Sequence, residues 1–234
     1  NGQGNQPSET FHPDGIQGSN GYWRIYNNTF GDHTQEIFIQ SEPDLNSGIL
    51  EEIYIYNNIF EKRGTGSSKD ITLSLNAGTV NTTWSNVLMA NNTHQTNDIT
   101  LRLLAKSTGA TINLNNCSFD NNIISPGGVI NMNNGGEGVV TWPSGEFLAR
   151  NNLFQSTGAT IKWKENSYST VNSWQTGNPL DCFSNITGNS NFRNSGAFDY
   201  RILSGSAAIN NGTNLSQSFT TDYLGKPRGT YWDI

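Results

Sequence analysis

The chain has 234 residues, which is enough for one domain with a substantial core. Only 33% of the residues are hydrophobic and 14% are charged, yet 11% are aromatic, a share that disordered chains rarely contain. A net charge of -6 without a basic stripe argues against a nucleic-acid partner, and no apolar run is long enough to span a membrane.

A pair of polar residues follows an apolar stretch at regular intervals along the chain. Its first members are Asn27, Asn57, Asn91, Asn121, Asn151 and Ser184, and its second members are Asn28, Asn58, Asn92, Asn122, Asn152 and Asn185. Successive pairs are separated by 30, 34, 30, 30 and 33 residues. This regularity indicates stacked structural units. The alternative is a set of unrelated Asn-rich surface turns.

Apolar residues fall into columns when the units are aligned on the pair. Two positions before its first member are Ile25, Ile55, Met89, Phe119, Ala149 and Cys182. Four positions before it are Trp23, Ile53, Val87, Cys117, Phe147 and Leu180. This period-two alternation predicts a strand with one buried face in each unit. Both cysteines then lie in the core as small buried hydrophobic residues.

A second strand is expected about ten residues after each pair. Its apolar segments are residues 37–39, 71–73, 99–101, 129–130 and 161–163. No stretch has convincing helical periodicity. Short strands at a fixed period without helices predict an all-β parallel solenoid of about six to seven coils. The second column of the pair is unbroken asparagine, so we expect it to form an internal ladder of stacked amides.

The repeated pattern, seen as RIYNNTF and IYIYNNIF in the first two units, resembles the right-handed parallel β-helices of the pectate-lyase-like superfamily. The C-terminal run from YRILSGSAAINNG through TDYLGKPRG to the final DI resembles the closing segment of secreted bacterial β-helix proteins. The resemblance implies an N-terminal tail at 1–10, a single-stranded β-helix at 11–199 and a closing segment at 200–234 that packs on the last coils. It also implies an extracellular or cell-surface location. In such proteins the closing motif continues further, so we expect that a downstream surface anchor is missing from this chain.

The segment HPDGIQ, residues 12–17, resembles an element of the first coil in such proteins. If Ile16, Ile37 and Ile71 share a column, His33 lies beside His12. In the same way, Gln35 lies beside Asp14, and Lys69 lies beside Gln35 on the next coil. A histidine, a carboxylate and a cation on neighbouring coils suit elimination chemistry on uronic acids, in which a base removes a proton and a cation stabilises the resulting charge. We therefore predict His12, Asp14, His33 and Lys69 as catalytic residues. The alternative is a structural turn at Pro13 and Gly15.

Other polar and aromatic residues are candidates for ligand contacts. Ca²⁺ is the cofactor that this chemistry suggests, with Asp14 and Asp32 as its ligands. Arg24, Lys62 and Arg63 lie close to the N-terminal patch in sequence. If Trp84, Trp142 and Trp174 are exposed, they can stack on sugar rings, and if buried they pack at corners. His94 shares a column with Phe30 and Phe60, which predicts a structural role.

Two functions remain open at this point. One is a carbohydrate-active enzyme, most simply a lyase that acts on an acidic polysaccharide. The other is a non-catalytic adhesive or structural surface module. Both readings take a polysaccharide as the expected partner, although the module could bind another ligand. Fold alone does not decide between them, because one fold supports many functions.

Overall fold

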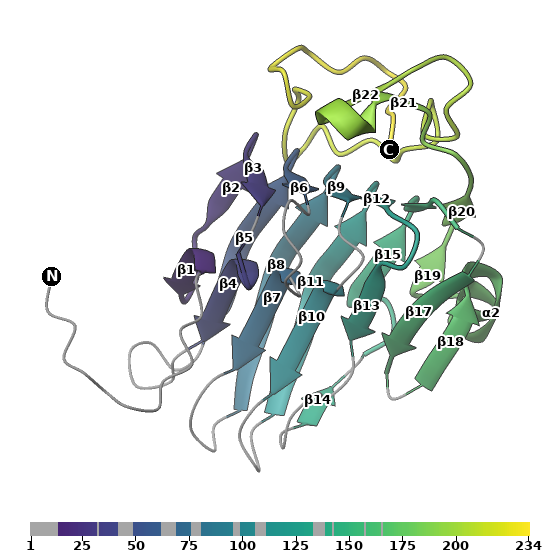
Figure 1. Ribbon diagram of the computed structural model, residues 1–234. Helices are drawn as coiled ribbons and strands as arrows, with labels where there is room; N and C mark the ends of the chain where they lie inside the picture. Colours follow the sequence, from purple (N-terminus) through teal and green to yellow (C-terminus); the bar gives the residue numbers. More distant parts are fainter. Residues whose placement is uncertain are drawn as a thin grey trace, which may run out of the picture.

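The computed structural model describes residues 14–31, 33–41, 49–61, 69–75, 81–95, 99–105, 111–132, 139–141, 143–156, 158–164 and 166–234. Within these residues, most strands belong to three parallel sheets that surround one core (Figure 1). Their arrangement is a parallel β-solenoid, as the repeat predicted. No helix in the described part of the chain is long and apolar enough to cross a membrane.

Each sheet collects one strand from successive turns of the chain. Sheet A contains β1 (Asp14–Ser19), β4 (Gln35–Ser41), β7 (Lys69–Leu75), β10 (Ile99–Ala105), β13 (Val129–Met132) and β17 (Gly158–Trp163). Sheet B contains β2 (Arg24–Tyr26), β5 (Leu50–Tyr56), β8 (Asn81–Ala90), β11 (Thr111–Asp120), β15 (Phe147–Arg150) and β19 (Cys182–Phe183). Sheet C contains β3 (Thr29–Gly31), β6 (Ile59–Glu61), β9 (Thr93–Gln95), β12 (Ile123–Ile124), β16 (Leu153–Phe154) and β20 (Ile186–Thr187).

The solenoid makes about four turns, fewer than the six to seven predicted. The Asn pair marks only the corner between sheets B and C, whereas a regular turn also needs one continuous strand in every sheet. After β12 this regularity weakens, because β14 (Val139–Thr141) and β15 both pair with β11. After β17 the chain turns back as the antiparallel strand β18 (Asn166–Thr170) and then forms helix α2 (Val171–Gly177). The expectation of no helix was therefore wrong at this one end of the solenoid.

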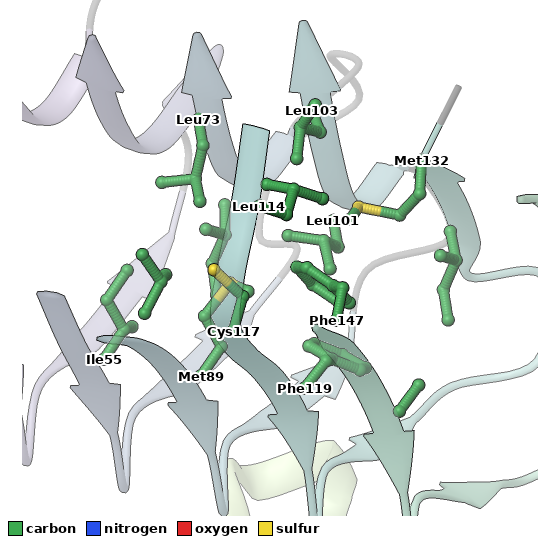
Figure 2. Close-up of a cluster of buried hydrophobic side chains, with 14 of the residues drawn as sticks. Ile55, Leu73, Met89, Leu101, Leu103, Leu114, Cys117, Phe119, Met132 and Phe147 are labelled. Carbon is green, nitrogen blue, oxygen red and sulfur yellow. The ribbon is translucent and has the colours of Figure 1, made fainter. Parts of the chain in front are cut away.

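The predicted apolar columns form the core. The column that begins at Ile25 and continues through Ile55 and Met89 has the expected register and is buried along its whole length. Figure 2 shows side chains of sheets A and B pointing toward one another across this core, among them Leu73, Leu101, Met132, Cys117, Phe119 and Phe147. Leu180 departs from its column, because it is 70% exposed and lies in the turn that follows α2.

Both cysteines are buried free thiols, as predicted. Burial raises the pKa of Cys117 to about 11 and also raises the pKa of Cys182. Because the thiolate is the reactive form, we expect neither thiol to react with Ellman's reagent at about pH 8 while the protein is folded. Both should react in urea. Rapid labelling of the folded protein would show that the core opens at these positions.

The two members of the Asn pair have different roles. The second members form the predicted internal ladder, in which each side-chain amide donates to the side-chain oxygen of the next at 2.8–3.1 Å, from Asn28 through Asn185. The first members have left-handed backbone conformations, with φ between 51° and 57°. Asparagine tolerates this region better than most residues, so the first position turns the corner and the second ties the turns together.

Candidate functional site

The outward-facing asparagines of the pair hold the closing segment, residues 200–234, against the solenoid. Their side-chain amides donate to its backbone carbonyl oxygens at 2.8–2.9 Å, with Asn57 bonded to Thr221, Asn91 to Asp233, Asn121 to Thr213 and Asn151 to Asn211. At the first turn the hydroxyl groups of Thr29 and Tyr223 are 3.0 Å apart. The closing segment therefore runs back along the solenoid as far as its first turn (Figure 1).

An aromatic side chain fixes the closing segment to sheet B. Phe219 stacks on Tyr56, with 4.3 Å between the ring centroids. Tyr26 and Tyr56 share a column with Ala90, the small residue of the following turn. Phe219, Tyr56 and Ala90 belong to one buried cluster together with Trp232. We expect the small side chain of Ala90 to leave room for the ring of Phe219.

A cavity of about 550 Å³ lies between the closing segment and the outer side of sheet C. Sheet C contributes one residue of each of four successive turns to its lining, Thr29, Ile59, Thr93 and Ile123, and the corner adds Asn57, Asn58 and Asn91. Opposite them lie the residues around β22 (Asp199–Ile202), which pairs with β21 (Phe192–Asn194), and residues 222–224, 226, 228 and 233–234. This volume lies within the range typical of small-molecule sites.

The charged groups of the cavity differ in how far they are already paired. Arg201 donates to both carboxylate oxygens of Asp199, at 2.7 and 2.5 Å. These hydrogen bonds lower the pKa of Asp199 to about 2. Arg228 donates to the side-chain oxygen of Asn57 at 3.0 Å and lies over the Trp232 ring. Among the described residues, the ammonium group of Lys226 has no partner, which leaves it available to a ligand anion or hydroxyl group.

An exposed aromatic residue in a strained conformation lines the cavity. Phe198 has a φ of 59° and is 49% exposed, at the end of the short 3-10 helix η1 (Ser195–Ala197). Leu224, which also lines the cavity, is 58% exposed. Bulky residues rarely adopt left-handed conformations, and such strain is concentrated at functional sites. The cavity thus combines exposed apolar surface with one unpaired cation.

The predicted N-terminal patch lies at a different place, where sheet C leads into sheet A. Asp14, Gln35 and Lys69 are in register as predicted, and Gln35 donates to Asp14 at 3.3 Å. The Nδ1 atom of His33 is 2.6 Å from a carboxylate oxygen of Glu36, and its ring lies next to Gly15. The structure therefore brings Asp14, His33 and Lys69 to one corner.

Two buried carboxylates complete this corner, and neither was among the predicted site residues. Glu36 and Asp70 are fully buried on adjacent turns, and Asp70 is 2.8 Å from the Nδ1 atom of His94. His94 is fully buried and stacked on Phe60, which matches the structural role predicted for it. The spacing of His33 and Glu36 was the available signal, because residues three apart can meet across a tight turn.

Burial raises the pKa of Glu36, and the nearby Asp70 adds to this effect while His33 opposes it. A carboxyl group with a raised pKa stabilises the fold fully below its unfolded pKa, near 4.5, and this contribution is lost as the pH rises through the folded value. The free energy of unfolding of the wild type should therefore fall, relative to that of Glu36→Gln, as the pH rises above about 4.5. Denaturant titrations across this range measure the difference. Parallel pH profiles would contradict the assignment.

The remaining candidates do not join either site. Trp84 and Trp174 are fully buried, which corrects the prediction that they contact ligand and supports the packing alternative. Arg24 is exposed and lies over the Tyr54 ring, 4.4 Å from its centroid. His12, Asp32, Lys62, Arg63 and Trp142 lie outside the described residues.

Of the two predicted Ca²⁺ ligands, Asp14 is among the described residues and Asp32 is not. In the part of the chain that the structure describes, no group of three or more His, Cys, Asp or Glu side chains is arranged to hold a metal ion. Asp14 instead accepts a hydrogen bond from Gln35.

Comparison with protein-family models found no match, and comparisons with curated proteins and with solved structures found none either.

Proposed function

We propose that this β-solenoid binds a polysaccharide and holds one stretch of it in the cavity beneath the closing segment. The observation that carries the proposal is the exposed ring of Phe198, on a left-handed backbone, at a cavity of suitable size. Rigid aromatic rings supply apolar contact area at low entropic cost, and a sugar ring presents an apolar face of similar size. The hydroxyl and carboxylate groups of a sugar would find partners in Tyr223, Asp222 and Lys226.

The sequence pattern supports the same ligand class. The repeat and the closing motif resemble pectate-lyase-like β-helices and secreted bacterial β-helix proteins, so membership of that superfamily and an extracellular or cell-surface location are part of the proposal. The cavity is a feature separate from the repeat, because it forms where the closing segment lies over sheet C.

The test is isothermal titration calorimetry with polygalacturonate, alginate, xylan and mannan. We expect at least one of them to bind, and we expect Phe198→Ala to weaken that binding about tenfold, which corresponds to 1.4 kcal/mol. Leu203→Ala is the matched control, because Leu203 is 44% exposed and does not line the cavity. The proposal fails if no polysaccharide binds, or if the two variants weaken binding equally.

A specific observation favours a second candidate function, a lyase that acts on acidic polysaccharides. The carboxylate of Glu36 fixes the Nδ1 side of the His33 ring, and the His33 side chain is 39% exposed, so its Nε2 atom is placed to accept a proton from a ligand. Ultraviolet absorbance of unsaturated uronides would report the reaction on polygalacturonate or alginate. Activity that falls about 100-fold in His33→Ala would support the lyase. Binding without any product would leave a non-catalytic module.

A further inference from the structure

We infer that the bound glycan continues from the cavity around the corner between sheets C and B onto a row of exposed side chains on the outer face of β2. This inference rests on the proposed function and extends it from a cavity that holds a few sugars to a site for a polymer. Arg24 and Tyr26 alternate with the buried Ile25 in β2 and therefore share its outer face, and the exposed Tyr22 lies just before the strand. We call these three exposed residues, with Glu51, Glu52 and Tyr54 beside them, the tyrosine platform.

Tyr26 is held rigidly and still presents a large exposed surface. Its ring stacks on Tyr56, with centroids 5.0 Å apart and planes within 3°, and Tyr56 in turn stacks on Phe219. Tyr26 belongs to the first turn and, in the described part of the chain, stacks on no other ring, so it remains 49% exposed. A ring that is already ordered loses little conformational entropy when a sugar stacks on it.

Tyr22 is fixed in an unusual conformation that projects it outward. It is 75% exposed and has a φ of 69°, which is rare for a bulky residue. Its backbone N–H donates to the Glu51 carbonyl at 2.8 Å, and its hydroxyl donates to a Glu51 carboxylate oxygen at 2.6 Å. Gly21 permits this close approach, because a Cβ atom there would lie 2.6 Å from the Glu51 carbonyl oxygen.

The polar groups of the platform define the sugar that fits it. Tyr54 donates to Glu52 at 2.8 Å, and Arg24 covers its ring. The platform thus offers two carboxylates and one guanidinium group. Carboxylates accept hydrogen bonds from sugar hydroxyl groups but repel a uronic acid. An uncharged sugar therefore suits the platform, whereas Lys226 allows an acidic sugar in the cavity.

The nearest residues of the platform and the cavity are three positions apart in the first turn. Tyr26 ends β2, and Thr29, three residues later, lines the cavity and contacts the Tyr223 hydroxyl. Between them, Asn27 and Asn28 turn the corner. A ligand that fills the cavity at the first turn and extends by a few sugars would reach Tyr26.

The test compares oligosaccharides of one, three and six sugars, prepared from xylan, mannan and polygalacturonate, by titration calorimetry. In the wild type, the hexamer of the best-binding series should bind about tenfold tighter than its trimer, because it reaches a second set of contacts. Tyr26→Ala should abolish this gain and leave trimer affinity unchanged, and Tyr26→Phe should keep it. Phe183→Ala is the matched control, because Phe183 is 40% exposed in the same column at the opposite end of the solenoid.

The outcomes separate this inference from the proposed function. Equal affinity for trimer and hexamer, or a gain that survives in Tyr26→Ala, would overturn the platform while leaving the cavity as the binding site. An equal loss in Phe183→Ala would overturn it too, because the effect would not be local to the first turn. Absence of binding at every length in all three series would overturn both.

Discussion

Replacement of Asn92 by alanine should lower the free energy of unfolding by about 3–5 kcal/mol. The side-chain amide of Asn92 donates to the Ile55 carbonyl at 3.0 Å and to Asn122 at 3.1 Å. Its side-chain oxygen accepts from the backbone N–H of Asn58 at 3.0 Å. Alanine would leave the Asn58 N–H and the Ile55 carbonyl buried without these partners, and each unpaired buried group costs about 1–3 kcal/mol.

Asn28→Ala provides the matched control for this experiment. Asn28 is exposed at the first turn and donates to Asn58 and to the Tyr26 carbonyl, so its removal should cost only about 1 kcal/mol. Equilibrium unfolding in urea measures both variants. If the two losses were equal and small, the ladder would not stabilise the solenoid through its buried hydrogen bonds.

Phe219→Ala should lower the free energy of unfolding by about 3 kcal/mol and release the closing segment. The Phe219 ring is 7% exposed and lies against Tyr56, Trp232 and the Arg228 guanidinium group. Its loss should leave a hole that the small side chain of Ala90 does not fill. Since the closing segment forms one wall of the cavity, we also expect polysaccharide binding to be lost in this variant.

Hydrogen exchange of residues 211–234 measures this release directly. Exchange that speeds up more there than in β8 and β11 is the expected result. Phe198→Ala is the control, because Phe198 is half-exposed and its removal should change stability by less than about 0.5 kcal/mol. Uniformly faster exchange throughout the solenoid would instead mean that the closing segment and the solenoid unfold together.

The sequence was sufficient for the solenoid because its stacking repeats the same chemistry at each turn. A column such as Ile25, Ile55 and Met89 can be read from spacing alone, since in-register parallel strands place equivalent residues directly over one another. The unbroken column of second asparagines identified the ladder for the same reason. These features are local and periodic, so a linear pattern contains them.

Features that depend on contacts between distant segments could not be read in this way. The cavity exists because residues such as Arg228 reach Asn57, which lies 171 positions earlier in the chain. The roles of Asn57 and Asn91 in holding the closing segment follow from their contacts with Thr221 and Asp233, which the spacing of the repeat does not reveal. Trp84 and Trp174 were ambiguous because a bulky aromatic side chain suits either a buried corner or a ligand surface.

Only part of the arrangement at the predicted catalytic corner could be predicted from the sequence. Register arguments placed Asp14, Gln35 and Lys69 correctly, because Ile16 and Ile37 anchor the strands. They did not reveal that Glu36 is buried beside His33, because alternation with Ile37 gives the face on which Glu36 lies and not whether that face is covered. Every residue of β4 after Gln35 is buried, so both faces of this strand are covered and alternation alone does not predict which side chains face solvent.

Mapping the bound polysaccharide by hydrogen exchange tests the central functional proposal most directly. The comparison uses the wild-type protein with and without the polysaccharide that binds it best. We predict slower exchange in residues 198–202 and 222–228, which line the cavity, together with residues 22–26 if the ligand reaches the tyrosine platform. Protection confined to the corner of His33, Glu36 and Lys69, with no change in the closing segment, would contradict the proposed site.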